Sequence, residues 1–254
     1  MNSLSCTLRV LLLGSLPGLA SAAVITYTWN SDFADSGVVP DGNPLGWSNT
    51  RNLSGITTTS LTDVNVSLSI SGGYNGDLFV YLQHDSGIAI LLNRPGKTSL
   101  DPFGYDDSGF NVTFDDSAAN GDSHINFTGD LILGGASWRP DGRAVNPALV
   151  LVGDTRSSLL NGLNGLNPNG DWTLFVADMS GGDLTQSQVA SWGLTLTAVP
   201  EPCEVAALGL LIGSSLFLRT RPKPRASPAQ TNFPGAALGH PNSPIPPDGH
   251  RPIR

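Results

Sequence analysis

The stretch 65-NVSLSISGGYNGDLFVYLQHDSGIAILLNRP-95 decides the fold class of this chain. Polar and apolar residues alternate over residues 65–71, which is the period of a half-buried β-strand. A Gly-rich turn follows, and residues 77–82 and 88–92 then form two apolar runs separated by the turn sequence 84–87. Three strands with such short connections predict an antiparallel β-meander.

The rest of the chain between residues 23 and 199 also has short strand-like segments separated by turns and loops. We expect further strands at 24–29, 110–114, 148–152, 171–178 and 192–197, with a long loop at 31–50. Trp172 and Trp192 alternate with apolar residues and are expected in the core. Many short strands without an amphipathic helix predict an all-β, jelly-roll-like β-sandwich.

The acidic residues of this region are all aspartates. Between Ala23 and Val199 there are 18 Asp and no Glu against six Lys and Arg, a net charge of −12. Asp favours turns, caps and hard-cation sites, whereas Glu favours helices. The composition therefore indicates a loop-rich β-domain, and the negative charge argues against nucleic acid or an anionic membrane as a partner.

The N-terminal segment has the pattern of a secretory signal peptide over residues 1–22. Arg9 precedes an apolar run, and Ala20-Ser21-Ala22 forms a small-residue cleavage site that would leave Ala23 first. A short transmembrane helix is the alternative, but Gly and Pro break the run early. The two cysteines, Cys6 and Cys203, lie outside the exported region, so its stability cannot rest on a disulfide.

Asp77 stands after a glycine at the start of an apolar strand. Its carboxylate needs backbone N–H groups, an Arg or a metal as a partner. Asp115, Asp116 and Asp178 also flank apolar strands. We hypothesise that these four line one Ca²⁺ site; the alternative is that they are solvated or capping turn residues. The sequence requires no cofactor, and Ca²⁺ is the one candidate.

Two tryptophans, Trp47 and Trp138, fall in predicted loops. They are candidates for an exposed, sugar-stacking ligand face. His84 and His124 stand in turn contexts without metal-ligand spacing and are expected at the surface. The region has no thiol nucleophile and no Gly-x-Ser-x-Gly elbow, so we expect no enzyme.

Several blocks of this sequence resemble the P domain (P/Homo B domain) of proprotein convertases. They are YNGDLFVYL at 74–82, LLNRP at 91–95, DSGF at 107–110, NGDWTLFVAD at 169–178 and SWGLTL at 191–196. The resemblance covers roughly residues 64–197 and implies a β-sandwich that follows a protease domain. Only about 40 residues separate Ala23 from the predicted meander, too few for a subtilisin-like fold, so the resemblance does not carry peptidase activity over.

The C-terminal part is similar to a PEP-CTERM sorting signal. Residues 199–225 contain a short motif, an apolar run at 205–218 and a basic cluster that would stay cytoplasmic. The motif is Val199, Pro200, Glu201 and Pro202, and the cluster is Arg219, Arg221, Lys223 and Arg225. The resemblance implies an exosortase-type processing enzyme as partner and an inner-membrane anchor formed by one short hydrophobic helix. A packed core helix is the alternative for residues 205–218.

The predicted domain order is a signal peptide at 1–22, a strand and loop region at 23–63 and a P-domain-like sandwich at 64–198. The sorting segment at 199–225 and a disordered Pro-rich tail at 226–254 follow. We therefore expect an exported, non-catalytic protein of the cell surface or extracellular matrix. Two alternatives stay open: a carbohydrate- or Ca²⁺-dependent binding module, with extracellular polysaccharide as partner, and an accessory domain of a separate subtilisin-like protease.

Overall fold

The computed structural model describes residues 22–126, 136–182 and 184–200. Residues 1–21 of the predicted signal peptide, the apolar run at 205–218 and the Pro-rich tail lie outside these residues. Within the described part of the chain, no helix has the length and apolar character needed to cross a membrane.

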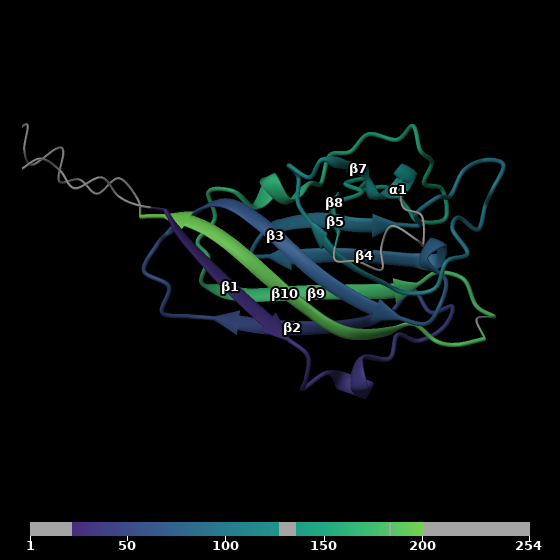
Figure 1. The fold of residues 1–254 in the computed structure, drawn as a ribbon, viewed down its shortest axis with the longest axis horizontal. Helices are drawn as coiled ribbons and strands as arrows, with labels where there is room; N and C mark the ends of the chain where they lie inside the picture. Colours follow the sequence, from purple (N-terminus) through teal and green to yellow (C-terminus); the bar gives the residue numbers. More distant parts are fainter. Residues whose placement is uncertain (1–21, 127–135, 183, 201–254) are drawn as a thin grey trace, which may run out of the picture. The chain divides into compact units, whose positions relative to one another are not determined.

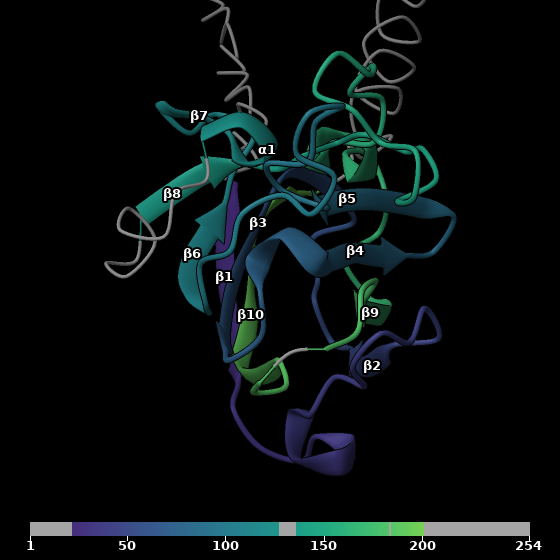
Figure 2. The same ribbon diagram turned by 90° about the vertical axis from the view of Figure 1, so that its right-hand side faces the viewer.

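Ten strands form two sheets that face each other (Figures 1 and 2). The six-stranded sheet runs β1 (Ala23–Trp29), β10 (Gln188–Val199), β3 (Ser60–Ser71), β6 (Phe110–Phe114), β8 (Ala136–Arg139) and β7 (Asn120–Asp122). The four-stranded sheet runs β2 (Trp47–Leu53), β9 (Gly170–Asp178), β4 (Leu78–His84) and β5 (Gly87–Asn93). The helical turns are η1 (Ala34–Gly37), η2 (Asn75–Asp77), α1 (Ser123–Asn126) and η3 (Leu160–Leu163). The all-β sandwich predicted from the sequence is confirmed.

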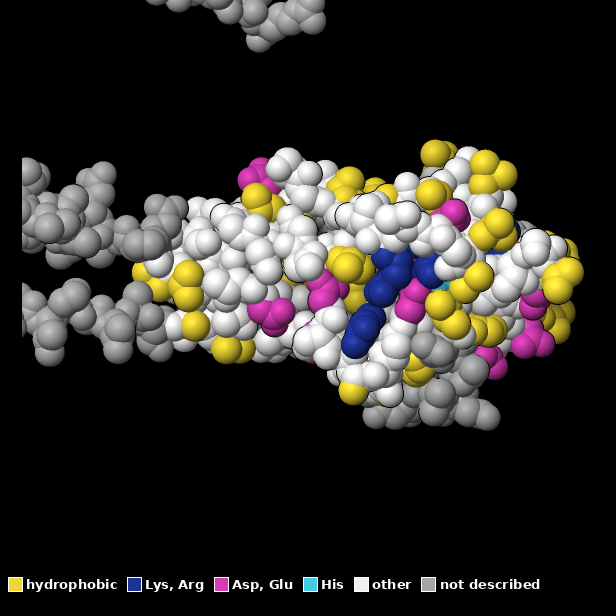
Figure 3. Space-filling model, turned by 90° about the horizontal axis from the view of Figure 1, so that it is seen from above, with side chains coloured by type: hydrophobic (Ala, Val, Ile, Leu, Met, Phe, Trp, Pro, Cys, Tyr) yellow, Lys and Arg dark blue, Asp and Glu magenta, His cyan; other side chains and the backbone are white. Residues whose placement is uncertain are grey.

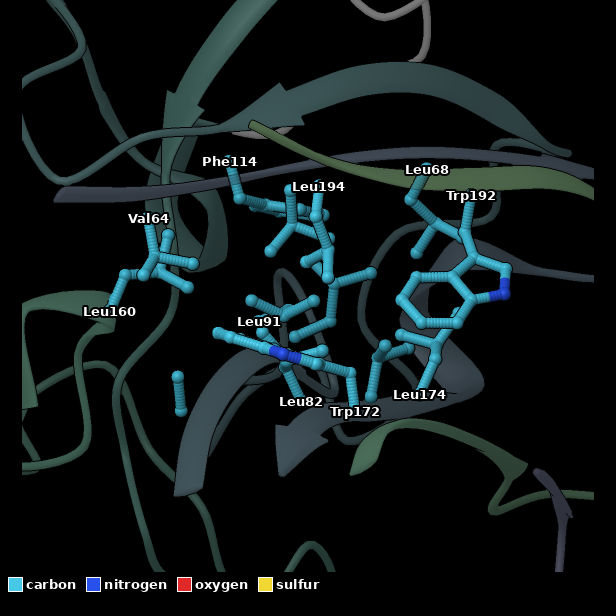
Figure 4. Packing of buried hydrophobic residues seen from close by; sticks show 14 of the residues in the cluster. Val64, Leu68, Leu82, Leu91, Phe114, Leu160, Trp172, Leu174, Trp192 and Leu194 are labelled. Atoms are coloured by element: carbon cyan, nitrogen blue, oxygen red, sulfur yellow. The ribbon is translucent and has the colours of Figure 1, made fainter. Parts of the chain in front are cut away.

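The core lies between the sheets and follows the alternation of the sequence. In β3, Val66, Leu68 and Ile70 are buried while the residues between them are partly exposed. Trp172 of β9 and Trp192 of β10 are fully buried, and Figure 4 shows both indoles pointing into the same interior from opposite sheets. The prediction that these two tryptophans belong to the core is confirmed.

The predicted three-strand meander is wrong at its first connection. Strand β3 pairs with β10 and β6, whereas β4 pairs with β5 and β9 in the other sheet. The Gly-rich turn at 72–77 therefore carries the chain across the sandwich, and only the β4–β5 hairpin is as predicted. A short turn can lead to either layer, because the apolar face of β3 is buried in both cases.

Three other expectations also need correction. Strand β8 pairs in parallel with β6 and β7, so the six-stranded sheet is mixed and not purely antiparallel. Residues 148–152 are not a strand, because their backbone is held by turns and by loop contacts. Residues 23–63 also belong to the sandwich itself, since β1 pairs with β10 and β2 pairs with β9.

The outer side of β5 is covered by irregular segments. The N–H groups of Asp141 and Gly142 donate to the carbonyls of Leu91 and Ile90 at 2.9 Å, and Ile90 donates to Ser158 at 2.9 Å. We call this side of the sandwich, formed by β5, β7, β8, α1 and residues 140–160, the closed edge. Figure 3 looks down on it and shows Lys and Arg side chains gathered in one stripe. On the opposite side, β1 ends the six-stranded sheet, and we call it the open edge.

Candidate functional site

The structure brings two of the four predicted metal ligands together. Asp77 precedes β4 and Asp178 ends β9, and these strands are paired so that Leu78 lies opposite Asp178. The N–H group of Met179 donates to the carbonyl of Asp77 at 2.8 Å. Both aspartates are buried, and they mark one end of the sandwich, which we call the loop end.

Asp115 and Asp116 lie elsewhere. They follow the C-terminal end of β6, whereas η2, with Asp77, contacts Gly109 at the opposite end of that strand. Asp115 accepts hydrogen bonds from the N–H and hydroxyl groups of Ser117, both at 2.7 Å, and Asp116 accepts one from the N–H of Asn161 at 2.7 Å. These two carboxylates therefore cap loop backbone, as in the alternative considered from the sequence.

The predicted single calcium site is consequently wrong in its geometry. In residues 22–126, 136–182 and 184–200, no three His, Cys, Asp or Glu side chains converge to form a metal site. Binding of Ca²⁺ by the chain stays a prediction. The side chains of Asp115 and Asp116 also lie near Asp63, whose pKa is raised, first by burial and then by the negative charge of Asp115.

Asp77 has an arginine as its partner. The Asp77 carboxylate and the Arg94 guanidinium are 3.0 Å apart, and both side chains are only 8% exposed. Arg94 also donates to the carbonyl of Gly76 at 2.5 Å and faces the carbonyls of Pro102 and Phe103 at 3.4 Å. One buried guanidinium thus fixes η2 to the loop at 101–105, and its charge balances that of Asp77.

A cavity of about 210 Å³ opens between these loops at the loop end. Its walls are aromatic side chains, two carboxylates and small residues of the turn after β9. They are Tyr74, Asp77, Phe103, Gly104, Tyr105, Asp106, Ser180, Gly181 and Gly182. We call this cavity the aromatic pocket.

Close backbone packing holds the aromatic pocket in shape. A Cβ atom on Gly76 would lie 2.5 Å from the carbonyl oxygen of Phe103, and one on Gly96 would lie 2.6 Å from the Tyr105 ring. The Tyr105 hydroxyl donates to the carbonyl of Ile125 at 2.6 Å. The Tyr105 ring is therefore fixed before any ligand arrives, which reduces the entropy lost on binding.

The chemistry of the aromatic pocket is that of a binding site for a small polar molecule with apolar faces. Burial, and then the charges of Asp107 and Asp122, raise the pKa of Tyr105, so its phenol stays neutral at physiological pH. Tyr74 is 37% and Phe103 69% exposed, so both offer ring surface that a ligand would cover. Carboxylate oxygens at the rim accept hydrogen bonds from hydroxyl groups.

The predicted ligand face of Trp47 and Trp138 is wrong, because both side chains are buried, with 5% and 2% exposed. Trp47 begins β2, packs edge-on against Phe33 and donates to the carbonyl of Ala34 at 2.9 Å. Trp138 lies in β8, which pairs on both sides with other strands. The polar residues that flank both tryptophans predicted loops. In the structure, both lie in strands, and their indoles point into the protein interior.

The two histidines are also buried, contrary to the prediction. The His84 ring stacks on Trp172 with 3.8 Å between centroids, and its two nitrogens lie 2.9 Å and 2.6 Å from the carbonyl oxygens of Asp171 and Asn167. A polar hollow of about 360 Å³ opens beside His84. Since backbone oxygens already engage both ring nitrogens, His84 offers no free nitrogen to a ligand there.

His124 belongs to a buried charged network at the closed edge. Its Nδ1 atom lies 2.8 Å from the Asp141 carboxylate, and its Nε2 atom lies 3.1 Å from the carbonyl oxygen of Lys97. A catalytic His–Asp pair needs the second nitrogen to face a substrate or nucleophile. Here a backbone carbonyl occupies that place and the ring is 1% exposed, so the contact is structural.

The same network contains two arginines. Arg143 contacts Asp122 at 2.8 Å and Asp141 at 3.0 Å, and Arg156 lies 3.6 Å from Asp122. Burial alone would lower the pKa of Arg143, but the hydrogen bonds and charges of the two aspartates outweigh it and raise that pKa. The guanidinium therefore stays charged inside the closed edge.

The start of the predicted sorting motif lies at the end of the sandwich away from the aromatic pocket. Val199 ends β10, and Pro200 follows it. Ala23 pairs with Ala198, so β1 begins beside the place where β10 ends. Glu201, Pro202 and the basic cluster lie outside the described residues.

One feature of the sequence indicates the aromatic pocket, although strand periodicity does not detect it. Tyr74, Phe103 and Tyr105 each stand next to or between glycines in polar loops. An aromatic residue in such a loop has no strand pattern to place it in the core. The position of Asp77 indicates the loop end of the sandwich but not the aromatic rings that line the pocket.

Comparison with known proteins gives little support from relatives. No protein-family model matches the chain, and no curated protein matches it. Among solved structures, the serine protease of Aeromonas sobria is similar, at 15% identity alone and 16% in its complex with the chaperone ORF2. Both matches have a TM-score of 0.40 and cover 71% of this chain but only 28% of the protease. A likeness this weak does not establish a shared fold, so the P-domain resemblance stays a prediction.

Proposed function

We propose that this chain is an exported, non-catalytic protein of the cell surface or extracellular matrix that binds polysaccharide through the aromatic pocket. Export and anchoring follow from the signal-peptide pattern and the PEP-CTERM-like segment of the sequence. The binding role rests on one observation: three aromatic rings and two carboxylates line a cavity that is formed without a ligand.

A neutral sugar suits the aromatic pocket better than a cation does. The C–H face of a pyranose can lie against Tyr74, Phe103 or Tyr105, while its hydroxyl groups donate to Asp77 and Asp106. Asp77 already has Arg94 at 3.0 Å as its counter-ion. A second positive charge would have to compete with that arginine, whereas a sugar hydroxyl needs only an acceptor oxygen.

The proposal of a non-catalytic role has support from the residues that resemble catalytic groups. The His124–Asp141 contact is closed by the Lys97 carbonyl, and His84 is held between two backbone oxygens. In the aromatic pocket, the lining groups that could donate or accept a proton are the hydroxyls of Tyr74, Tyr105 and Ser180 and the carboxylates of Asp77 and Asp106, and the Tyr105 hydroxyl is engaged by Ile125. Among the described residues that line the pocket there is no His, Cys or Lys, so the Ser180 hydroxyl has no histidine or lysine base beside it there.

Binding of the purified full chain to a glycan array, followed by titration with the best glycan, tests the proposal. Phe103→Ala should weaken binding at least about fivefold, because one aromatic contact contributes about 1 kcal/mol. Leu149→Ala is the matched control, since Leu149 is 72% exposed and lies outside the pocket. Equal loss in both variants, or binding of a Lys-rich peptide in place of any glycan, would contradict the proposal.

The same titration with a chelator separates this role from its alternatives. We expect glycan binding to be unchanged by chelation, because Asp77 is balanced by Arg94 and needs no metal. Loss of binding on chelation would favour the Ca²⁺-dependent module instead. Absence of glycan binding, with co-purification of a subtilisin-like protease from the exporting host, would favour the accessory-domain role.

A further inference from the structure

Strand β1 is paired on one side only. All seven of its residues, Ala23–Trp29, lie opposite residues of β10 in an antiparallel ladder. Among the described residues, no strand pairs with its other side, because β1 ends the six-stranded sheet. An edge strand presents a row of backbone N–H and C=O groups that another strand can pair with.

The open edge lacks charged residues and proline, which are two of the features that usually prevent such pairing. Its sequence, AVITYTW, contains no charged residue and no proline, and it is rich in β-branched and aromatic residues. The corresponding strand at the closed edge, β5, accepts backbone hydrogen bonds from Asp141 and Gly142 and donates one to the carbonyl of Ser158. Loop backbone therefore covers the outer side of β5, whereas no strand of the described residues pairs with the outer side of β1.

The inner face of β1 is also incompletely covered. Ile25, Tyr27 and Trp29 point inward but are only partly buried. Tyr27 and Trp29 stack on each other with 5.9 Å between ring centroids, and Trp29 lies 4.4 Å from Trp192. Arg51 of β2 covers only one end of this row, with its guanidinium 5.8 Å from the Trp29 ring.

We propose that the open edge pairs with the β1 strand of a second copy of this chain, in an antiparallel arrangement with its two-fold axis at Thr26. The same strand then meets itself, as a two-fold symmetric interface requires. The expected pairs are Thr26 with Thr26, Ile25 with Tyr27, Val24 with Thr28 and Ala23 with Trp29. Aromatic with β-branched pairs and Thr with Thr pairs are favourable across strands. The domain already contains two Thr pairs, Thr26 with Thr195 and Thr50 with Thr173.

Charge favours a second copy at this edge over contacts elsewhere. The region from Ala23 to Val199 carries a net charge of −12, so two copies repel each other over most of their surfaces. The seven uncharged residues of β1 allow approach without like charges in contact. An interface built on one strand pair is small, in the class below about 1,200 Å² that forms weak complexes. Association should therefore rise with concentration, as it would for many copies gathered at one surface.

Sedimentation velocity of the purified full chain over a wide concentration range tests the pairing. The wild type should pass from monomer to dimer as concentration rises. The double variant Val24→Lys with Thr28→Lys should stay monomeric, because positions 24 and 28 lie opposite each other in the two copies and would place lysine against lysine. Both side chains are exposed, Val24 at 67%, so the fold of each copy should tolerate the changes.

The matched variant is Val24→Lys with Thr28→Glu. It carries the same number of substitutions at the same exposed positions, but it places lysine opposite glutamate twice in the antiparallel dimer, so dimerisation should return. A wild type that is monomeric at every concentration would overturn the proposal. Equal dimerisation of both double variants would place the interface elsewhere, and equal loss in both would exclude this register.

Discussion

The closed edge and the open edge differ in how the backbone groups on the outer side of their strands are paired. At the closed edge, β5 is covered by irregular backbone, and a buried network of Asp122, Asp141, Arg143 and His124 supports that cover. At the open edge, β1 has an uncharged sequence and no pairing strand on its outer side among the described residues. The first edge is completed within the chain, and the second is left for another chain.

The difference shows what irregular structure requires in a fold without disulfides. A strand satisfies its backbone groups through its neighbours, but buried loop backbone needs side-chain or loop partners. At the closed edge the Asp141 carboxylate accepts from the N–H groups of Asn93 and Arg143 as well as from the Arg143 side chain. Charged side chains are therefore buried where loops, not strands, close the core.

The largest loss of stability should come from Asp141→Ala at the closed edge. This carboxylate is fully buried and contacts Arg143 at 3.0 Å and His124 at 2.8 Å. Its removal leaves a buried guanidinium without one of its two counter-ions, and loss of one partner of a buried ion pair costs about 3–5 kcal/mol. We expect the urea midpoint of unfolding to fall sharply.

Asp106→Ala is the control for that loss, since it removes an exposed carboxylate from the same chain. It should change the free energy of unfolding by no more than about 0.5 kcal/mol. If Asp141→Ala were as mild as this control, the closed edge would be held by packing and backbone pairing, and the charged network would be incidental.

Prediction of the strands from the sequence was least accurate at the closed edge. Alternation of apolar and polar residues predicted β3, β9 and β10, and short apolar segments bounded by turns predicted β1, the β4–β5 hairpin and β6. These patterns failed at Trp138, which was placed in a turn but lies in β8, and at residues 148–152, an apolar run that forms no strand. These segments are fixed by contacts with distant residues, and no local pattern encodes such contacts.

At the candidate site, too, local sequence pattern predicts some features and contacts between distant residues decide the others. The charge and position of Asp77 correctly indicated a buried carboxylate that needs a partner, and of the possible partners the structure provides an arginine, Arg94, 17 residues later. Asp115 and Asp116 share the flanking pattern of Asp77 and lie at the other end of β6. Flanking pattern alone places a residue at a strand end, whereas the sheet topology decides which ends come together.

A smaller effect on the free energy of unfolding should come from Asp63, a partly buried carboxylate near Asp115. The pKa of Asp63 is raised by burial and by Asp115, so the folded state holds this proton more tightly than the unfolded state does. Stability from this group is therefore present at low pH and is lost as pH rises through the folded pKa. Asp63→Asn should stabilise the fold at pH 7 by less than about 1 kcal/mol, because the group is partly solvated.

Urea unfolding at pH 7 and at pH 3 checks the sign of the Asp63 effect. The variant should exceed the wild type at pH 7 and match it at pH 3, where the wild-type carboxyl is protonated in both states. Asn at this position can still accept from the Asn65 amide, which lies 3.0 Å from the Asp63 carboxylate. A gain of equal size at both pH values would mean that packing, and not charge, is responsible.

The smallest effect on folding should come from the open edge. Val24→Lys replaces a side chain that is 67% exposed on a strand paired on one side. The free energy of unfolding, measured at a concentration where the chain is monomeric, should change by no more than about 0.5 kcal/mol. The same protein at high concentration should show weaker association than the wild type. A large loss of monomer stability would instead mean that β1 is completed within its own chain, and the contrast between the two edges would then disappear.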